Sequence, residues 1–505
     1  MGRLTFLPFV VLFSVAGASV AAGLDPSNVG SMTSPSANLY WQPDKSLPVV
    51  TRPDKAPSVP TQFTGPLSLA ELTDLALMLN PRTRQAWLSA RAEASALGIE
   101  NADDWPTITG LVTHRIGRAI SATSGAPVPV QTQYGPSVSL SYTLYDFGKG
   151  DASRDAANFR LLAANLAQNR TLQEVATQVE QAYYRALAFD YLVRASNDAL
   201  KNFQTALDAT QRRRTSGLAT AGDEYRAETQ VGQAQLTLTR NVGELAKARG
   251  QLSNAVGLPV NYDLKLKPVT ELPTVTEVKQ SLDVLIEKAK ASRPDLIASE
   301  AKARAARATA LAADRAGLPT LSFVANYGRV NFTNSGTNLA GYGFPTPPAV
   351  LTGAAAATAQ SVRPEQDVYQ LGFNLTIPIF NGFKDTYTAR RAQELAEQAE
   401  SARDQLLSQT ELDVWQSYYD LQTAASSVSS TANLVKSAAE SSAASAARYK
   451  SGIGNLLDFI TAQQDDTNAR VAQIQSYLDW YSALARLNFS LGASDSEIVK
   501  AQTKQ

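Results

Sequence analysis

The side chains that most often carry chemistry are scarce in this chain. Its 505 residues include no cysteine and one histidine, His114. Disulfides, thiolate metal sites and clusters of histidine ligands are therefore excluded, and neither a metal nor another cofactor is expected. His114 itself should lie in water near the end of a strand. Gly148-Lys149 is not a phosphate-binding loop, because the upstream glycine and the following Ser or Thr of that motif are missing.

Two carboxylates have matching surroundings. Asp223 follows a turn at Gly217, Asp458 follows a turn at Gly452, and each is expected to open a helix. A carboxylate at that place interacts favourably with the positive end of the helix dipole. No paired catalytic acids and no nucleophile motif accompany them, so an enzyme is not expected. The chain has 46 Lys and Arg residues and 46 Asp and Glu residues. This balance does not indicate the excess of positive charge that binding to nucleic acid requires.

Both aspartates belong to a tandem duplication. At an offset of 235, residues 145–257 align with residues 380–492 without a gap, and Asp223 falls on Asp458. Upstream the matching offset is 213, so the second copy carries an insertion of 22 residues. A unit of roughly 220 residues is a structural half, far longer than a solenoid repeat.

The duplication divides the chain into parts. The first 22 residues read as a signal peptide, because Arg3 precedes an apolar run that ends in small residues near Ala22. A transmembrane anchor is the alternative, but the run is shorter than the roughly 20 residues that a span needs. The expected parts are the signal peptide (1–22), a Pro-rich N-terminal extension (23–66), a first repeat (67–257), a linker or equatorial segment (258–280), a second repeat (281–492) and a C-terminal tail (493–505).

Each repeat contains two segments in which apolar and polar residues alternate. They predict β-hairpins at about 107–145 and 320–380, with the clearest alternation from Leu371 to Ile379 and a break in phase at Leu111. Each segment is about 9–11 residues long, which suits a tilted strand that crosses a bilayer, and apolar-out, polar-in alternation is typical of outer-membrane barrels. A half-buried antiparallel sheet alternates equally well, so the strands alone leave both interpretations open.

Two uninterrupted helices of unusual length are expected, from Lys149 to about Thr215 and from Lys384 to about Ser451. At 1.5 Å per residue each is roughly 100 Å long. Return helices complete helical hairpins over about 149–254 and 384–490. Helices this long cannot be buried in a globule, so they pack side by side in a coiled coil or a tube. Small residues, such as those of 438–447, favour a tube with a polar lumen.

A shorter, bent helix opens each repeat. Ser68 and Glu71 predict a capping box at the start of the first one, which bends at Pro81. In the second repeat Ser281 keeps the N-cap position, but Val284 replaces the glutamate.

The four strands of one chain cannot close a barrel, so their edges and apolar face would stay unsatisfied in lipid. Three copies supply twelve strands and twelve principal helix tracks, enough for two stacked cylinders, although other multiples also close. The expected fold class is a mixed α+β membrane protein with an internal duplication, in which long α-helical hairpins and four β-strands per chain assemble as a homotrimer.

From about Pro66 to Gly492 the chain resembles the TolC-type outer-membrane efflux family. The resemblance rests on features that occur in the same order in both repeats. They are the duplication, the approach to the sheet at 105–107 and 318–320, the strand-to-helix junctions 144–148 and 379–383, and the hairpin turns 216–223 and 451–458. It implies a trimeric exit duct for efflux or type I secretion, with a twelve-stranded β-barrel in outer-membrane lipid and a periplasmic α-barrel. It also implies two partners at the hairpin tips, a periplasmic adaptor protein and an inner-membrane pump.

The resemblance further implies site residues at the hairpin tips. A gate or constriction corresponds to Asp458 and, in the first repeat, to Asp223; three copies would form a carboxylate ring that favours cations. Both aspartates can equally be simple helix-start residues. Thr461 and Gly454 stand where relatives carry a second acidic residue and a basic lock residue, so how the closed state is held stays open. The residues implied for adaptor contact are Ser216, Gly217, Leu218, Ser451, Gly452 and Ile453. A plain left-handed turn also requires such glycines.

A competing interpretation is a coiled-coil-rich structural or adhesive surface protein without transport. It predicts no alternating strands, so residues 371–379 argue against it. The arginines near the turns, at 212–214 and 448, are expected to be solvated or paired within the chain. The repeated tyrosines should pack between helices rather than touch a transported solute; they are Tyr183, Tyr184, Tyr418 and Tyr419.

Overall fold

The computed structural model describes residues 65–117, 131–267, 275, 280–333 and 365–492. The chain divides into two units, Met1–Ser58 and Val59–Gln505, and all the described residues lie in the second. The expected signal peptide and C-terminal tail, and nearly all of the Pro-rich extension, lie outside the described residues. So does most of the connection inside the second β-hairpin.

Each repeat opens with two short helices rather than one bent helix. In the first repeat they are α1 (Leu69–Leu79) and α2 (Pro81–Ala102), and in the second α5 (Leu282–Ser292) and α6 (Pro294–Asp314), the latter followed by the 3-10 turn η3 (Arg315–Gly317). The predicted capping box is present, since the Ser68 amide donates to Glu71 Oε2 at 2.7 Å. Ser281 is the N-cap of α5, as predicted. Its side chain makes no capping hydrogen bond, and Val284 cannot reciprocate one.

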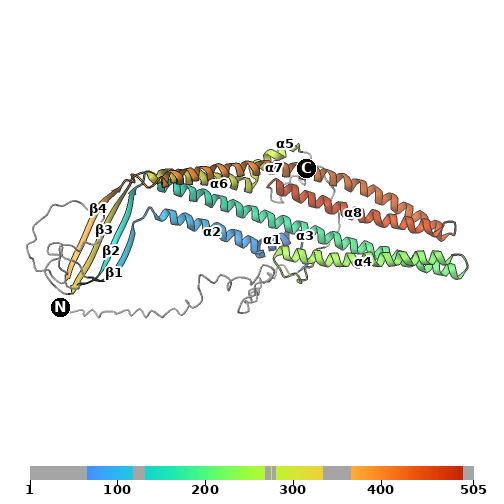
Figure 1. Cartoon of the computed structure of the whole chain (residues 1–505). Helices are drawn as coiled ribbons and strands as arrows, with labels where there is room; N and C mark the ends of the chain where they lie inside the picture. Colours follow the sequence, from blue (N-terminus) through green and yellow to red (C-terminus); the bar gives the residue numbers. More distant parts are fainter. Residues whose placement is uncertain (1–64, 118–130, 268–274, 276–279, 334–364, 493–505) are drawn as a thin grey trace, which may run out of the picture. The chain divides into compact units, whose positions relative to one another are not determined.

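The four predicted strands form one antiparallel sheet in the order β1-β2-β3-β4 (Figure 1). Their bounds are β1 (Thr107–Gly117), β2 (Gln131–Tyr145), β3 (Thr320–Thr333) and β4 (Glu365–Thr376). The strand predicted to end at Ile379 stops at Thr376, because Pro378 has no amide proton to donate to a ladder. At their N-terminal ends, β2 and β4 begin earlier than the alternation of apolar and polar residues indicated, at Gln131 and Glu365.

The strand register collects the apolar residues on one face of the sheet. Val138 lies opposite Tyr327, which lies opposite Tyr369, while the neighbouring row on the other face is Thr109, Ser139, Asn326 and Gln370. Leu111 falls on the polar face, as its break in phase predicted. The apolar face is uncovered in the single chain; its exposed members include Ile108, Val112, Val138, Tyr327, Tyr369, Leu371, Phe373 and Leu375. An apolar surface of this extent on one chain marks a contact with lipid or with another molecule.

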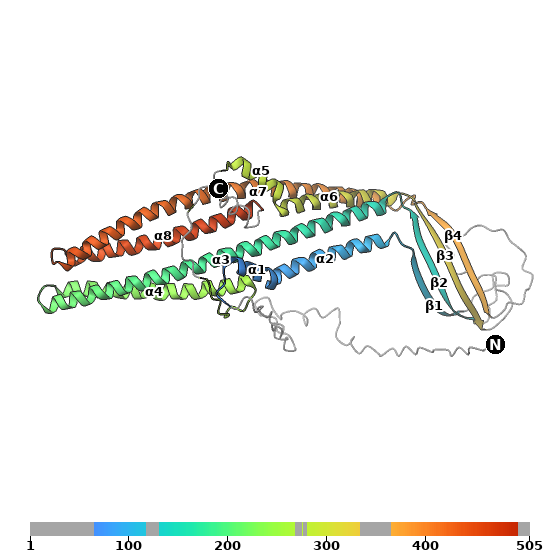
Figure 2. The same cartoon turned by 180° about the vertical axis from the view of Figure 1, so that it is seen from behind.

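The two predicted helical hairpins are the largest elements. They consist of α3 (Lys149–Thr215) with α4 (Ala221–Val256), and α7 (Lys384–Lys450) with α8 (Leu456–Ser490). Both α3 and α7 contain 67 residues, so each is roughly 100 Å long. Figures 1 and 2 show the hairpins side by side, and α3 packs along α8 as well as along its own partner α4.

Within the described part of the chain, no helix has an apolar stretch long enough to cross a membrane.

Each repeat has a hydrophobic core where the short first helix covers the base of its hairpin. In the first repeat, Leu75 of α1 is buried among Val179 of α3 and Leu252 of α4. In the second, Leu285 of α5 is buried among Val414 of α7 and Leu487 of α8. The two halves of the duplication are therefore built in the same way.

A left-handed glycine ends each return helix and touches the break between the two short helices. Gly257 has φ +90° and Gly492 has φ +69°. A Cβ on Gly492 would lie 2.9 Å from the Arg293 Cα, and one on Gly257 would lie 2.9 Å from the Asn80 Cα. Both the backbone conformation and the lack of space therefore require glycine here.

We expect Gly492→Ala to destabilise the protein by about 2–3 kcal/mol, because it combines left-handed strain with overpacking. The matched control is Gly243→Ala in the middle of α4, where no atom lies within 4 Å of the added Cβ; it should gain about 0.5–1 kcal/mol. Chemical denaturation of the detergent-solubilised protein measures both. Equal shifts in the same direction would show that packing at Gly492 is not tight.

Candidate functional site at the hairpin tips

The two hairpin turns have the same backbone. Gly217 and Gly452 adopt φ +77° and +82°. The Leu218 amide donates to the Arg213 carbonyl at 2.8 Å, and the Ile453 amide donates to the Arg448 carbonyl at 3.1 Å, as in a left-handed helix cap. The side chains of Leu218 and Ile453 are 73% and 83% exposed.

The serines before these glycines are engaged with their own helices. Ser216 Oγ donates to the Arg212 carbonyl at 3.1 Å, and Ser451 Oγ donates to the Ala447 carbonyl at 3.0 Å. Each tip therefore presents an apolar side chain rather than a hydroxyl.

Asp223 is committed to a cap. It is the third residue of α4 rather than its first, and Thr220 is the N-cap. The Thr220 amide and hydroxyl donate to Asp223 Oδ2 at 3.0 and 2.7 Å, and the Asp223 amide donates back to Thr220 Oγ1 at 3.1 Å. The hydrogen bonds from the Thr220 hydroxyl and amide hold the pKa of Asp223 below its ordinary value.

Asp458 has the same helix position but a free carboxylate. Asn455 is the N-cap of α8, and its Oδ1 accepts a hydrogen bond from the Asp458 amide at 2.7 Å. The side chain of Asp458 is exposed, and no described residue donates a hydrogen bond to its carboxylate. It lines a recess of about 370 Å³ with Arg448, Ile453 and Gly454. The structure thus separates two aspartates that the sequence treats as equivalent.

The tips of the two hairpins touch each other within one chain. Arg213 Nη1 donates to the Tyr449 carbonyl at 2.9 Å, and its guanidinium lies 4.6 Å from the centre of the Tyr449 ring. The Tyr449 hydroxyl is 3.0 Å from Thr210 Oγ1, and Arg214 pairs with Glu224. Arg213 and Arg214 have intrachain partners, as predicted. Apolar residues of all four long helices bury this contact: Ala199, Phe203, Ala227, Ala234, Tyr449, Leu456 and Ile460.

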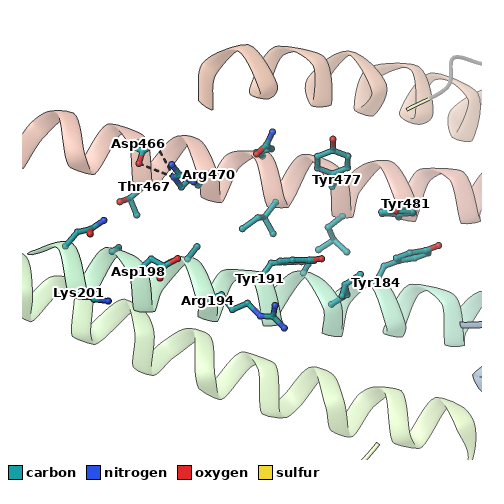
Figure 3. A pocket seen from close by; sticks show the side chains of 18 residues that line it. Tyr184, Tyr191, Arg194, Asp198, Lys201, Asp466, Thr467, Arg470, Tyr477 and Tyr481 are labelled. Atoms are coloured by element: carbon teal, nitrogen blue, oxygen red, sulfur yellow. Dashed lines mark hydrogen bonds and ion pairs between the residues drawn. The ribbon is translucent and has the colours of Figure 1, made fainter. Parts of the chain in front are cut away.

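A groove of about 620 Å³ runs between α3 and α8 (Figure 3). Tyr184 and Tyr191 of α3 and Tyr477 and Tyr481 of α8 line one part of it, and charged side chains line the part nearer the tips. Tyr184 stacks on Tyr481 with 3.8 Å between ring centres. Burial raises the pKa of Tyr481 above its ordinary value.

The predicted packing role of the repeated tyrosines holds for three of the four. Tyr183 is buried in the first core, Tyr184 stacks across the groove, and Tyr418 packs against the second core. Tyr419 is 44% exposed in the single chain. Sequence reasoning did not single out Tyr477 and Tyr481, although their spacing of four residues places them on one face of a helix.

A buried charge cluster at the base of the hairpins was also missed. The Arg293 side chain is only 3% exposed and binds Asp295 at 2.7 Å and Asp413 at 3.0 Å. Arg170 of α3 lies 3.5 Å from Asp295 and donates to the Phe489 carbonyl of α8 at 3.0 Å. Burial by itself raises the pKa of Asp295, but the hydrogen bonds from Arg293 and the charge of Arg170 outweigh it and lower that pKa. The cluster joins α3, α6, α7 and α8.

None of these arrangements brings together the groups of a catalytic or metal site. The described residues contain no group of three or more His, Asp or Glu side chains that could hold a metal ion. His114 is exposed on β1, with its ring centre 6.5 Å from that of Tyr134.

Comparison with known proteins gives the family. The family profile described as "Outer membrane efflux protein" matches residues 72–258 and 285–493, one match in each repeat. Protein CyaE of Bordetella pertussis is 25% identical over 411 residues, which cover 81% of this chain and 81% of CyaE. Outer membrane protein OprJ of Pseudomonas aeruginosa is 25% identical over 447 residues, which cover 86% of each chain.

Solved structures show the same fold. The outer-membrane channel OprN superposes with a TM-score of 0.72 at 18% identity, covering 84% of this chain and 90% of that one. The CmeC outer membrane channel of Campylobacter jejuni gives 0.71 at 17% identity, covering 86% and 88%.

Long helical hairpins joined to a four-stranded antiparallel sheet define a class of outer-membrane channel proteins. The chain belongs to the outer membrane efflux protein family. As a member of that family it is an outer-membrane efflux channel protein and not an enzyme.

We expect Asp223→Ala to lower the free energy of unfolding by about 1 kcal/mol at neutral pH, because the Thr220 amide and hydroxyl lose the carboxylate that accepts their hydrogen bonds in the capping box. The folded pKa of Asp223 is depressed, so its contribution is complete above the unfolded value of about 3.9 and is lost as the pH falls through the folded value. Denaturation of parent and variant between pH 7 and strong acid should therefore show the difference shrink. Asp458→Ala is the control, and a pH-dependent loss of equal size there would contradict the assignment.

Proposed function

We propose that three copies of this chain close into one conduit, which meets a periplasmic adaptor protein and an inner-membrane pump at the hairpin tips. In this assembly the sheets would form a twelve-stranded β-barrel in outer-membrane lipid, and the hairpins an α-barrel in the periplasm. The signal peptide over residues 1–22 would direct export, and the two repeats, 67–257 and 281–492, would occupy equivalent places around the axis.

One observation carries the proposal, namely that burial differs between equivalent residues of the two repeats. Within the chain α3 packs on α8, and the duplication makes α7 the equivalent of α3 and α4 the equivalent of α8. Ile460 of α8 is 6% exposed, whereas its equivalent Tyr225 on α4 is 63% exposed. Ala199 of α3 is 7% exposed, whereas its equivalent Leu434 on α7 is 50% exposed. A second copy would cover these faces as α3 and α8 cover each other.

The sheet supports the same assembly. β1 and β4 are its two edges, and unpaired edge amides and carbonyls are not tolerated in lipid. Copies that meet along α4 and α7 can pair β1 with the β4 of a neighbour, and three copies give twelve strands. The competing interpretation, a structural or adhesive protein without transport, does not explain why one face of the sheet is apolar and exposed.

We expect a cross-link between copies at the equivalent of the tyrosine stack. Tyr184 and Tyr481 correspond to Tyr419 and Ala246, and the chain has no cysteine of its own. The double variant Tyr419→Cys/Ala246→Cys, treated in detergent with a short bis-thiol reagent, should give dimers and trimers on a denaturing gel. The control Tyr184→Cys/Tyr481→Cys should react within one chain and migrate as a monomer.

The parent should in addition form a trimer that heat dissociates. A monodisperse monomer in mild detergent, still helical by circular dichroism and without cross-links between copies, would refute the assembly.

We also propose that Asp458 forms the selective carboxylate ring at the narrow end, with Asp223 contributing less. The free, exposed carboxylate of Asp458 supports this role, whereas that of Asp223 is occupied by Thr220. Leu218 and Ile453, the most exposed apolar side chains of the two turns, would contact the adaptor together with Ser216, Gly217, Ser451 and Gly452. The relative TtgC of Pseudomonas putida is named an outer membrane protein of a toluene efflux pump, which fits such a role.

Replacing Asp458 with Ala should reduce cation preference in planar bilayers and weaken block by divalent and trivalent cations, because the ring loses three negative charges. Asp223→Ala should change selectivity less and stability more. Unaltered selectivity and block in Asp458→Ala would show that the carboxylate does not face the conduit.

A further inference from the structure

The two junctions between strand and long helix share a strained backbone. Each contains two successive residues with positive φ: Phe147 (57°) and Gly148 (81°) before α3, and Gly382 (69°) and Phe383 (62°) before α7. Among the described residues, these two phenylalanines are the only non-glycine residues with positive φ. The positions are equivalent in the duplication, but the order of Phe and Gly is reversed. Each junction thus keeps one bulky residue in a conformation that bulky side chains rarely adopt.

Packing explains the glycine at one junction but the phenylalanine at neither. A Cβ on Gly148 would lie 2.6 Å from Arg315 Nη1, and Arg315 donates to the Gly148 carbonyl at 2.8 Å. A side chain at that position would therefore displace the end of the Arg315 side chain and disturb this hydrogen bond. No atom lies within 4 Å of a Cβ on Gly382, so the second junction has room at either place. Phe147 and Phe383 are 43% and 62% exposed, so neither fills a core.

Phe147 continues the exposed apolar face of the sheet, and Phe383 lies beside a second exposed aromatic ring past the end of β4. A register shift between Thr143 and Tyr145 places Tyr145 opposite Leu321, on the apolar face. The ring of Phe147 lies 4.8 Å from that of Tyr145, and the ring of Phe383 lies 5.4 Å from that of Phe380.

The residues that follow are charged, with Lys149 opening α3 and Lys384-Asp385 opening α7. An apolar surface followed by exposed aromatic rings and then by charges is the order found where hydrocarbon gives way to headgroups.

We propose that Phe147 and Phe383, with Tyr145 and Phe380, are lipid anchors at the headgroup boundary on the helix side of the sheet. The chain accepts the strained backbone because it places a rigid aromatic ring outward at that depth. The inference rests on the proposed function, in which the apolar face of the sheet contacts lipid, and it adds the residues that fix how deep the sheet sits.

Spin labels test the depth directly, because the cysteine-free chain accepts single labels. The full-length variants Phe147→Cys and Phe383→Cys, each carrying a nitroxide, are reconstituted into phospholipid bilayers. The relative accessibility to oxygen and to a water-soluble nickel chelate then reports depth. Leu375→Cys on the apolar face and Tyr387→Cys, 66% exposed in the first turn of α7, are the controls. We expect Leu375 in hydrocarbon, Tyr387 in water, and both junction labels between them.

The controls separate the two proposals. Junction labels as accessible to nickel as Tyr387, with Leu375 in hydrocarbon, would overturn the anchor alone. Leu375 in water would overturn the proposed membrane sheet as well.

A second set of variants tests why phenylalanine is kept. In detergent, Phe147→Gly/Phe383→Gly should melt at or above the parent temperature, because the strain is relieved. In bilayers the same variant should lose part of the rise in melting temperature that lipid confers, and Phe383→Trp should keep it. An equal loss in detergent and in bilayers would show that the rings pack within the protein, and the inference would fail.

Discussion

A sheet with two open edges and one bare apolar face cannot be satisfied by the chain that carries it. Backbone groups without a partner in hydrocarbon cost several kcal/mol each, and the edges β1 and β4 present a row of them. Rows such as Val138, Tyr327 and Tyr369 face outward without cover. Lipid can cover the face, but only another sheet can pair the edges. In the proposed assembly the rest of the molecule follows from this constraint, because the helices that continue from the strands would meet the helices of neighbouring copies.

The duplication lets one pattern of contacts serve twice, with different strengths. The seam inside the chain has a tyrosine stack at its middle and the contact of Phe203 with the neighbouring hairpin near its tip. The equivalents on the other faces differ in both directions. Ala246 replaces Tyr481 and Ala438 replaces Phe203, whereas Leu434 replaces Ala199 and Tyr225 replaces Ile460. Because Leu434 and Tyr225 are exposed, the apolar area that a neighbouring copy would cover in the proposed assembly lies at other positions than in the inner seam.

Much of the fold could be predicted because its signals are local and long. The absence of Pro and Gly over most of α3 and α7 predicted both helices to within a residue, and the alternation around Leu371 and Phe373 predicted the sheet. The predicted end of β4 was too late. The alternation of apolar and polar residues continues through Ile377 and Ile379, but Pro378 has no amide proton for a hydrogen bond between strands. The cluster of Arg170, Arg293, Asp295 and Asp413 could not be predicted, because its members are brought together only by the packing of four helices.

At the candidate site, too, the sequence could not predict a decisive contact, here a single hydrogen bond. Asp223 and Asp458 match in the duplication, but the N-cap residues before them differ. The Thr220 hydroxyl both accepts from the amide of Asp223 and donates to its carboxylate, so that carboxylate is used up in the cap. The side-chain oxygen of Asn455 can only accept a hydrogen bond, so it does not bind the carboxylate of Asp458, which stays exposed at the hairpin tip.

The base of the hairpins and their tips are held by different forces, and this bears on where a conduit can change shape. At the base, a buried guanidinium is shared between two carboxylates on different helices. Separating α6 from α7 would break the pair between the buried Arg293 and Asp413, which costs several kcal/mol because a buried charge loses one of its two partners. At the tips, Leu218 and Ile453 are exposed, and the contact between hairpins depends on Tyr449 with Arg213 and Thr210. The neutral hydrogen bond between Thr210 and Tyr449 contributes about 0.5–1.5 kcal/mol, and the charged one from Arg213 about 1.5–3 kcal/mol. In the proposed conduit, a rearrangement that opens the narrow end would therefore cost least beyond the charge cluster, at the end of the hairpins that carries the free carboxylate of Asp458.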